Sequence, residues 1–156
     1  MPVRGNNNKQ TEERGKGSTM TFARFTIAYW CVLIMALMPI ACAAIAKYGM
    51  MGTPRRDGGF DNHNPRGWLA GQRDWRGRAN AAQANTFESL PFFFAAVIIA
   101  HLLQAAQTRL DILALLFVFL RIAYVMMYVA DLPKARSAIW AVALFINICI
   151  LFSGYR

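Results

Sequence analysis

The chain has 156 residues, of which 56% are hydrophobic and 16% charged, and it carries a formal net charge of +9. A soluble domain has roughly 45–50% apolar and about 25% charged residues, so this composition excludes an ordinary soluble domain. The charges leave three uncharged runs, at 25–46, 89–108 and 137–155. Each run is about the 20 residues needed to cross a bilayer, which predicts an all-α membrane protein. The positive charge then suits lipid headgroups, and no nucleic acid partner is expected.

The chain is predicted to begin with a polar tail, followed by the first spanning helix. Residues 1–21 have no apolar periodicity and are rich in Gly, Asn and charge, which is typical of disorder. The first helix is predicted over 22–48, with a kink at Pro39. Its apolar run exceeds the roughly 7–15 residues of a signal-peptide core, so we expect it to remain uncleaved.

The rest of the chain predicts three further spanning helices in the same domain, 22–156. A long polar connection with turn signals precedes them, and we expect it to pack on the bundle or to carry function. The helices are predicted over 79–106, 109–130 and 134–152, where the third contains one charge, Arg121. Their short connections predict antiparallel neighbours in a four-helix bundle.

Orientation follows from the Lys and Arg residues at the two ends of the bundle. Four crossings place both chain termini on one side and the loops after the first and third helices on the other. Nine Lys and Arg residues flank those two loops, against seven on the terminal side. The positive-inside rule therefore favours a cytoplasmic position for the two loops.

Several polar side chains lie inside or beside the predicted spans. They are Arg78, Asn85 and Glu88 on the second helix, Arg121, Tyr124 and Tyr128 on the third, and Arg136 and Ser137 at the start of the fourth. At 100° per residue, each helix gathers its own set on one face. A charge at the centre of a spanning helix costs about 2.5–3.5 kcal/mol, which predicts that these faces form a site inside the bundle.

The balance of charge in this set leaves two interpretations open. Three arginines accompany one carboxylate, and the remaining side chains are hydrogen-bonding groups, which favours a cavity for a small anionic ligand. In the alternative, Glu88 neutralises Arg121 directly and the set is a structural ion pair between two helices.

Other residues with chemical potential receive structural interpretations. Cys31, Cys42 and Cys149 lie in apolar runs and are predicted to be buried hydrophobes. Asn147 in the fourth helix is predicted to hydrogen-bond to another helix. No spacing of His, Cys, Asp and Glu indicates a metal site.

Two segments resemble the MAPEG family, the membrane-associated proteins of eicosanoid and glutathione metabolism. The segments are RANAAQANTFESLPFFF, which starts at Arg78, and RIAYVMMYVADLPKARS, which starts at Arg121. The loop DNHNPRGWLAGQRDWRGR is similar to that of the bacterial branch. The resemblance implies a homotrimer of four-helix subunits, which a bacterial member would place in the inner membrane, with glutathione bound between subunits.

The resemblance also implies roles for the polar residues. Those that would hold glutathione are Arg78, Asn85, Glu88, Arg121, Tyr124 and Ser137. Arg136 matches by region the arginine that activates the glutathione thiol, and Tyr128 would donate a hydrogen bond to the thiolate. A small hydrophobic substrate would approach from the membrane lipid along the groove between subunits.

The chain departs from the eicosanoid synthases of the family at Ala81, where they carry a second arginine, and at Gly77, where they usually have Glu. Three functions therefore remain open at this stage. The first is a glutathione-dependent transferase or peroxidase that acts on hydrophobic electrophiles or lipid peroxides. The second is a non-catalytic lipid-binding or scaffold protein that uses the same groove. The third is a structural bundle whose polar residues form an internal ion-pair network.

Overall fold

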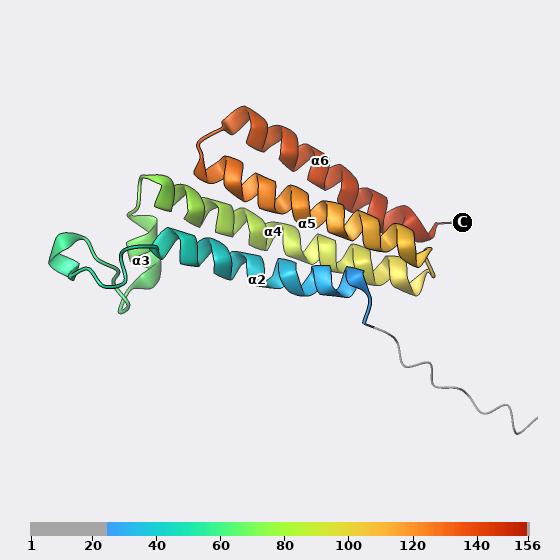
Figure 1. The fold of residues 1–156 in the computed structure, drawn as a ribbon, viewed down its shortest axis with the longest axis horizontal. Helices are drawn as coiled ribbons and strands as arrows, with labels where there is room; N and C mark the ends of the chain where they lie inside the picture. The colour runs from blue at the N-terminus through green and yellow to red at the C-terminus, as the bar shows by residue number, and fades with distance from the viewer. Residues whose placement is uncertain (1–24, 156) are drawn as a thin grey trace, which may run out of the picture.

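The computed structural model describes residues 25–155, and in that range the chain is helical, without strands (Figure 1). The four long helices are α2 (Ile27–Lys47), α4 (Trp75–Leu102), α5 (Gln107–Val129) and α6 (Pro133–Leu151). All four are long and apolar enough to cross a membrane, α6 together with the turn that follows it. The predicted all-α bundle of four spanning helices is confirmed, and the predicted tail, 1–21, lies outside the described residues.

The helices lie side by side in a single bundle (Figure 1). α2 packs on α4 and α5, α5 also packs on α4 and α6, and α4 reaches α6. Small buried residues, such as Ala82, Ala96 and Ala114, let the helix backbones approach closely. Phe93 of α4 stacks on Phe117 of α5 with ring centroids 4.4 Å apart, and both rings are buried in the core.

The ends of the helices differ from the predicted ends by a few residues. α4 begins at Trp75 instead of 79, because the Asp74 side chain caps it by accepting a hydrogen bond from the Arg76 backbone N–H at 2.9 Å. It ends at Leu102 instead of 106. α2 begins at Ile27, after a cap by Thr26, and it continues through Pro39 without a break in the helix.

The polar connection between α2 and α4 folds against one end of the bundle. It contains the short helices η1 (Arg55–Asp57) and α3 (Pro65–Ala70). Leu69 of α3 is buried against Ala46 and Ala79. The Trp68 indole N–H donates to the Gly58 carbonyl at 3.2 Å, and the Lys47 ammonium lies 4.5 Å from the centre of the Phe60 ring. The expectation that this segment packs on the bundle is confirmed.

The chain closes with the short helix η2 (Phe152–Gly154), which packs on α4 and α6. At this end of the bundle Asp111 of α5 accepts hydrogen bonds from the Ala28 backbone N–H and from Gln107, both at 2.8 Å. Asp111 thereby ties the first turn of α2 to α5. The polar residues predicted to form a site lie elsewhere, from the middle of the bundle to the end that carries α3.

Candidate functional site

The site is built around Arg121, which is only 1% exposed at its position in α5. Both terminal nitrogens of its guanidinium donate to Oδ1 of Asn85 at 3.1 Å, and Nη2 also donates to the Thr86 hydroxyl at 3.2 Å. Thr86 in turn donates to the Ala82 carbonyl within α4. A buried cation needs such partners, since an unpaired charge in an apolar interior is very costly.

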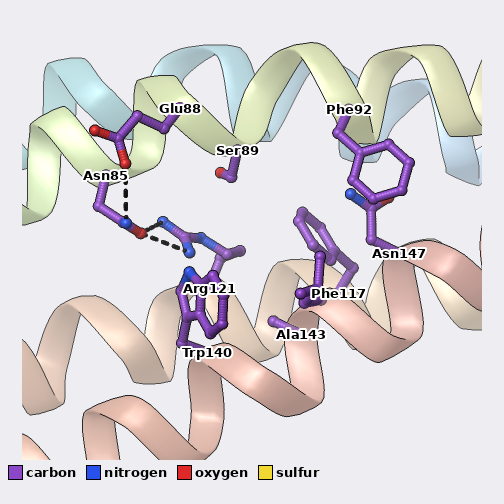
Figure 2. A pocket seen from close by; sticks show the side chains of 10 residues that line it. Asn85, Glu88, Ser89, Phe92, Phe117, Arg121, Trp140, Ala143 and Asn147 are labelled. Carbon is purple, nitrogen blue, oxygen red and sulfur yellow. Dashed lines mark hydrogen bonds between the residues drawn. The ribbon is translucent and has the colours of Figure 1, made fainter.

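Asn85 connects the buried arginine to the carboxylate of Glu88. Its Nδ2 donates to Glu88 Oε2 at 3.2 Å, while its Oδ1 accepts from Arg121 (Figure 2). The alternative of a direct ion pair between Glu88 and Arg121 is therefore wrong in its geometry. Among residues 25–155 the ion pairs within 4.0 Å do not include these two side chains, and a neutral amide lies between them. Glu88 itself is exposed on the face of α4.

A row of aromatic and cationic side chains leads from Arg121 toward the start of α6. The Arg121 guanidinium lies 4.5 Å from the centre of the Tyr124 ring. Tyr124 and Tyr128 meet edge to face with ring centroids 5.6 Å apart, and the Arg136 guanidinium lies 4.3 Å from the centre of the Tyr128 ring. This row, Arg121–Tyr124–Tyr128–Arg136, joins the stripe predicted on α5 to the arginine predicted on α6.

Arg78 and Ser137 lie outside the row. The Arg78 Nε donates to the Val129 carbonyl at 3.0 Å, and its Nη1 lies 3.6 Å from Asp131 Oδ2. Arg78 therefore binds the end of α5, where a cation satisfies the free carbonyls and the helix dipole. Ser137 is exposed in the first turn of α6.

A half-open cavity of about 180 Å³ lies beside Arg121, between α4, α5 and α6. Asn85, Glu88 and Arg121 form one end of it, and Phe92 and Asn147 lie at the other (Figure 2). Within residues 25–155, no group of three or more His, Cys, Asp and Glu side chains is arranged to hold a metal ion.

Comparison with known protein families gives a match to the MAPEG family over residues 27–155. The chain belongs to the MAPEG family. Neither the curated proteins nor the solved structures gave a match. Together with the four apolar helices, the family assignment establishes an integral membrane protein.

For this MAPEG protein, the structure brings together most of the residues singled out in the sequence. Asn85 and Glu88 of α4 connect to the row of four side chains through Arg121. Thr86 was missed, although it follows Asn85 directly, because a threonine inside a helix is most often an internally bonded residue. Its contact with Arg121 depends on how α4 and α5 are rotated against each other, which one helical stripe alone does not reveal.

Asn147 was predicted to hydrogen-bond to another helix, and the structure differs. Its side chain is 2% exposed and lines the cavity of the MAPEG protein, yet no residue among 25–155 donates to its Oδ1. Ser89 and Trp140, which line the same cavity, carried no signal in the sequence beyond their positions in apolar helices.

Proposed function

We propose that this protein is a glutathione-dependent transferase or peroxidase that acts on hydrophobic electrophiles or lipid peroxides. The observation that carries the proposal is the row Arg121–Tyr124–Tyr128–Arg136, in which two arginines are linked through two tyrosines. Among residues 25–155, Glu88 is the one carboxylate bonded to this network, through Asn85. The row therefore has surplus positive charge, which favours an anionic ligand.

The side chains of the site fit the groups of glutathione, which carries two carboxylates, one ammonium and a thiol. The Arg121 Nε is a buried donor without a partner among the described residues, and its guanidinium has no carboxylate bound to it directly. Arg121 therefore has capacity to donate to a ligand carboxylate. Glu88 is exposed and suits the ligand ammonium, while Asn85 keeps Arg121 and Glu88 in fixed positions. Ser137 is the more distant member of the proposed binding set, whereas we propose that Arg78, paired with Asp131 and bonded to the Val129 carbonyl, holds the end of α5 instead.

Arg136 and Tyr128 are the residues to which we assign the chemistry. Bound glutathione supplies a thiol whose deprotonated form is the nucleophile. Arg136 is half-buried and its charge would favour the thiolate over the thiol. Tyr128 lies against Arg136 and would donate its hydroxyl hydrogen to the sulfur, holding the thiolate in place. Tyr124 would keep Tyr128 in position through their edge-to-face contact.

A homotrimer would complete this site. Glu88 is exposed on α4, so the polar network is open on one face of the subunit. We propose that a neighbouring subunit covers this face and that glutathione lies between the two. The hydrophobic substrate would then enter from the membrane lipid, and the loop that carries α3 would face the cytoplasm of a bacterial inner membrane.

The test of the proposed chemistry is conjugation of glutathione to an activated chloroarene by the purified protein. We expect Arg136→Ala to lose most of the rate, about tenfold to a hundredfold, because the thiolate loses its cation. Lys134→Ala is the matched control, since Lys134 is exposed one position after Pro133 in the same turn of α6. An Arg136→Ala protein that keeps the rate of the Lys134→Ala protein would remove Arg136 from this role.

A second function is favoured by a different feature, an apolar groove of about 400 Å³ between α2 and α5. Its lining includes Leu37, Met38 and Cys42 of α2 together with Ile122 and Val125 of α5. Such a groove suits an acyl chain, and a non-catalytic lipid-binding or scaffold protein would need no other site. This function predicts that lipid co-purifies with the protein and that the chloroarene is not conjugated.

A further inference from the structure

Asn147 of α6 presents an unsatisfied acceptor to the cavity between α4, α5 and α6. The side chain is 98% buried, being 2% exposed, and its Oδ1 accepts no hydrogen bond from residues 25–155. Buried amide oxygens nearly always have a donor, because an unpaired one carries the full cost of its desolvation. The position of Asn147 in the cavity wall indicates that the missing donor belongs to something bound in the cavity.

Three aromatic side chains line the cavity, and one of them, Phe117, is held in place by packing. Phe92, Phe117 and Trp140 line the cavity, and Figure 2 shows Asn147 beside Phe92, away from Asn85 and Glu88. Phe117 is 2% exposed and is held from behind by its stacking on Phe93, with ring centroids 4.4 Å apart. The Phe117 wall of the cavity is therefore preformed, and the three rings suit the face and edge of another aromatic ring.

The volume of the cavity sets the size of its ligand. It measures about 180 Å³, whereas an apolar cavity of about 150 Å³ in another protein binds benzene. One six-membered ring with a small substituent therefore fills it. A tripeptide is much larger, so glutathione does not fit inside this cavity and would reach it only at the end formed by Glu88 and Arg121, beside the open face.

We propose that this cavity is a binding site for a monocyclic phenol, whose hydroxyl group donates its hydrogen to Asn147 Oδ1. The ring would lie among Phe92, Phe117 and Trp140, which supply the apolar contacts. Ala143, also in the wall and 2% exposed, leaves the room that the ring needs. The site does not depend on the proposed use of glutathione, because Asn147 is not a member of the polar network around Arg121.

The experiment compares two probes that differ by one hydroxyl group, 4-fluorophenol and fluorobenzene, by ligand-observed fluorine NMR on the full chain in detergent. We expect 4-fluorophenol to bind about tenfold more tightly, the contribution of one hydrogen bond to a buried acceptor. Asn147→Leu should abolish this preference, because the acceptor is gone. The matched control is Asn80→Leu, the same substitution in α4 at a residue that does not line the cavity, and it should keep the tenfold preference.

Ala143→Leu is a second variant, in which the larger side chain fills the cavity. The signal that remains with this variant measures how much probe dissolves in the micelle. Both probes should lose their specific binding to it, while Ala138→Leu, on the exposed side of α6, should bind like the unmodified protein. Equal affinity for the two probes would overturn the proposal, and so would a preference that survives Asn147→Leu. Absence of specific binding by either probe would mean that the cavity holds water only, which also overturns it.

Discussion

Two arginines of this protein are held in opposite ways, Arg121 in the middle of the bundle and Arg78 at the end that carries α3. Arg121 is buried, and its hydrogen-bond partners in the described residues are a neutral amide and a hydroxyl. Arg78 is about one-third exposed, with its side chain at 32%, and it pairs with the carboxylate of Asp131 and the carbonyl of Val129. The charge of Arg78, which water can reach, is neutralised by a carboxylate. The charge of Arg121, in the interior, is fixed in position and remains available to a ligand.

This difference separates the two functions of an arginine in a membrane bundle. A structural arginine needs its charge cancelled, and Arg78 has the partners for that at the end of α5. An arginine that binds anions must have its guanidinium held in position without having its charge neutralised. Asn85 and Thr86 hold Arg121 in this way. Three substitutions test whether this distinction holds.

Asn85→Leu should have the largest effect on stability, because it removes the oxygen that accepts from both terminal nitrogens of Arg121. Hydrogen bonds to charged groups are worth about 1.5–3 kcal/mol, and we expect the free energy of unfolding to fall by about 3 kcal/mol. Denaturant unfolding in mixed micelles measures it. For Asn80→Leu on the same helix, the free energy of unfolding should fall by less than about 1 kcal/mol. Equal losses in the two variants would show that Arg121 does not depend on Asn85.

Arg78→Ala should have an intermediate effect of about 1 kcal/mol on the free energy of unfolding. Its ion pair with Asp131 is exposed, and exposed pairs contribute about 0–1 kcal/mol, to which the bond to the Val129 carbonyl adds. The comparison is Arg73→Ala, at an exposed loop position, which should be close to neutral. A loss as large as that of Asn85→Leu would contradict the distinction between the two arginines.

Glu88→Gln should have the smallest effect on stability and a clear effect on binding. Glu88 is exposed, and a glutamine oxygen can still accept the hydrogen bond from Asn85, so we expect a change of a few tenths of a kcal/mol. Glutathione affinity should fall at least tenfold, because the amide no longer attracts the ligand ammonium. Asp131→Asn makes the same chemical change at the bundle end and should leave glutathione affinity unaltered. If Glu88→Gln instead unfolded the protein without a ligand effect, the structural interpretation of the network would be the better one.

The sequence predicts the number of spanning helices well, because long uncharged runs leave a chain few alternatives in a bilayer. It predicts the composition of each polar stripe as well, since 100° per residue is a property of a single helix. The start of α4 was predicted four residues late because the capping role of Asp74 depends on local backbone geometry.

Contacts between helices were harder to predict than the stripes themselves. Whether Glu88 meets Arg121 directly or through Asn85 depends on the rotation and depth of α4 against α5, which the sequence of either helix does not contain. The same holds for Asn147, because its missing partner is a property of the space between three helices. Interior polar residues were recognised by the energetic cost of placing them in a membrane. Their hydrogen-bond partners became known only from the structure.

We propose that Arg121, Arg136 and the tyrosines between them bind an anionic thiol, and calorimetric titration of the solubilised protein with glutathione measures this binding. We expect saturable binding by the unmodified protein, with affinity at least tenfold weaker for Glu88→Gln and unchanged for Asp131→Asn. Absence of heat from specific binding, or equal affinity in all three proteins, would contradict it.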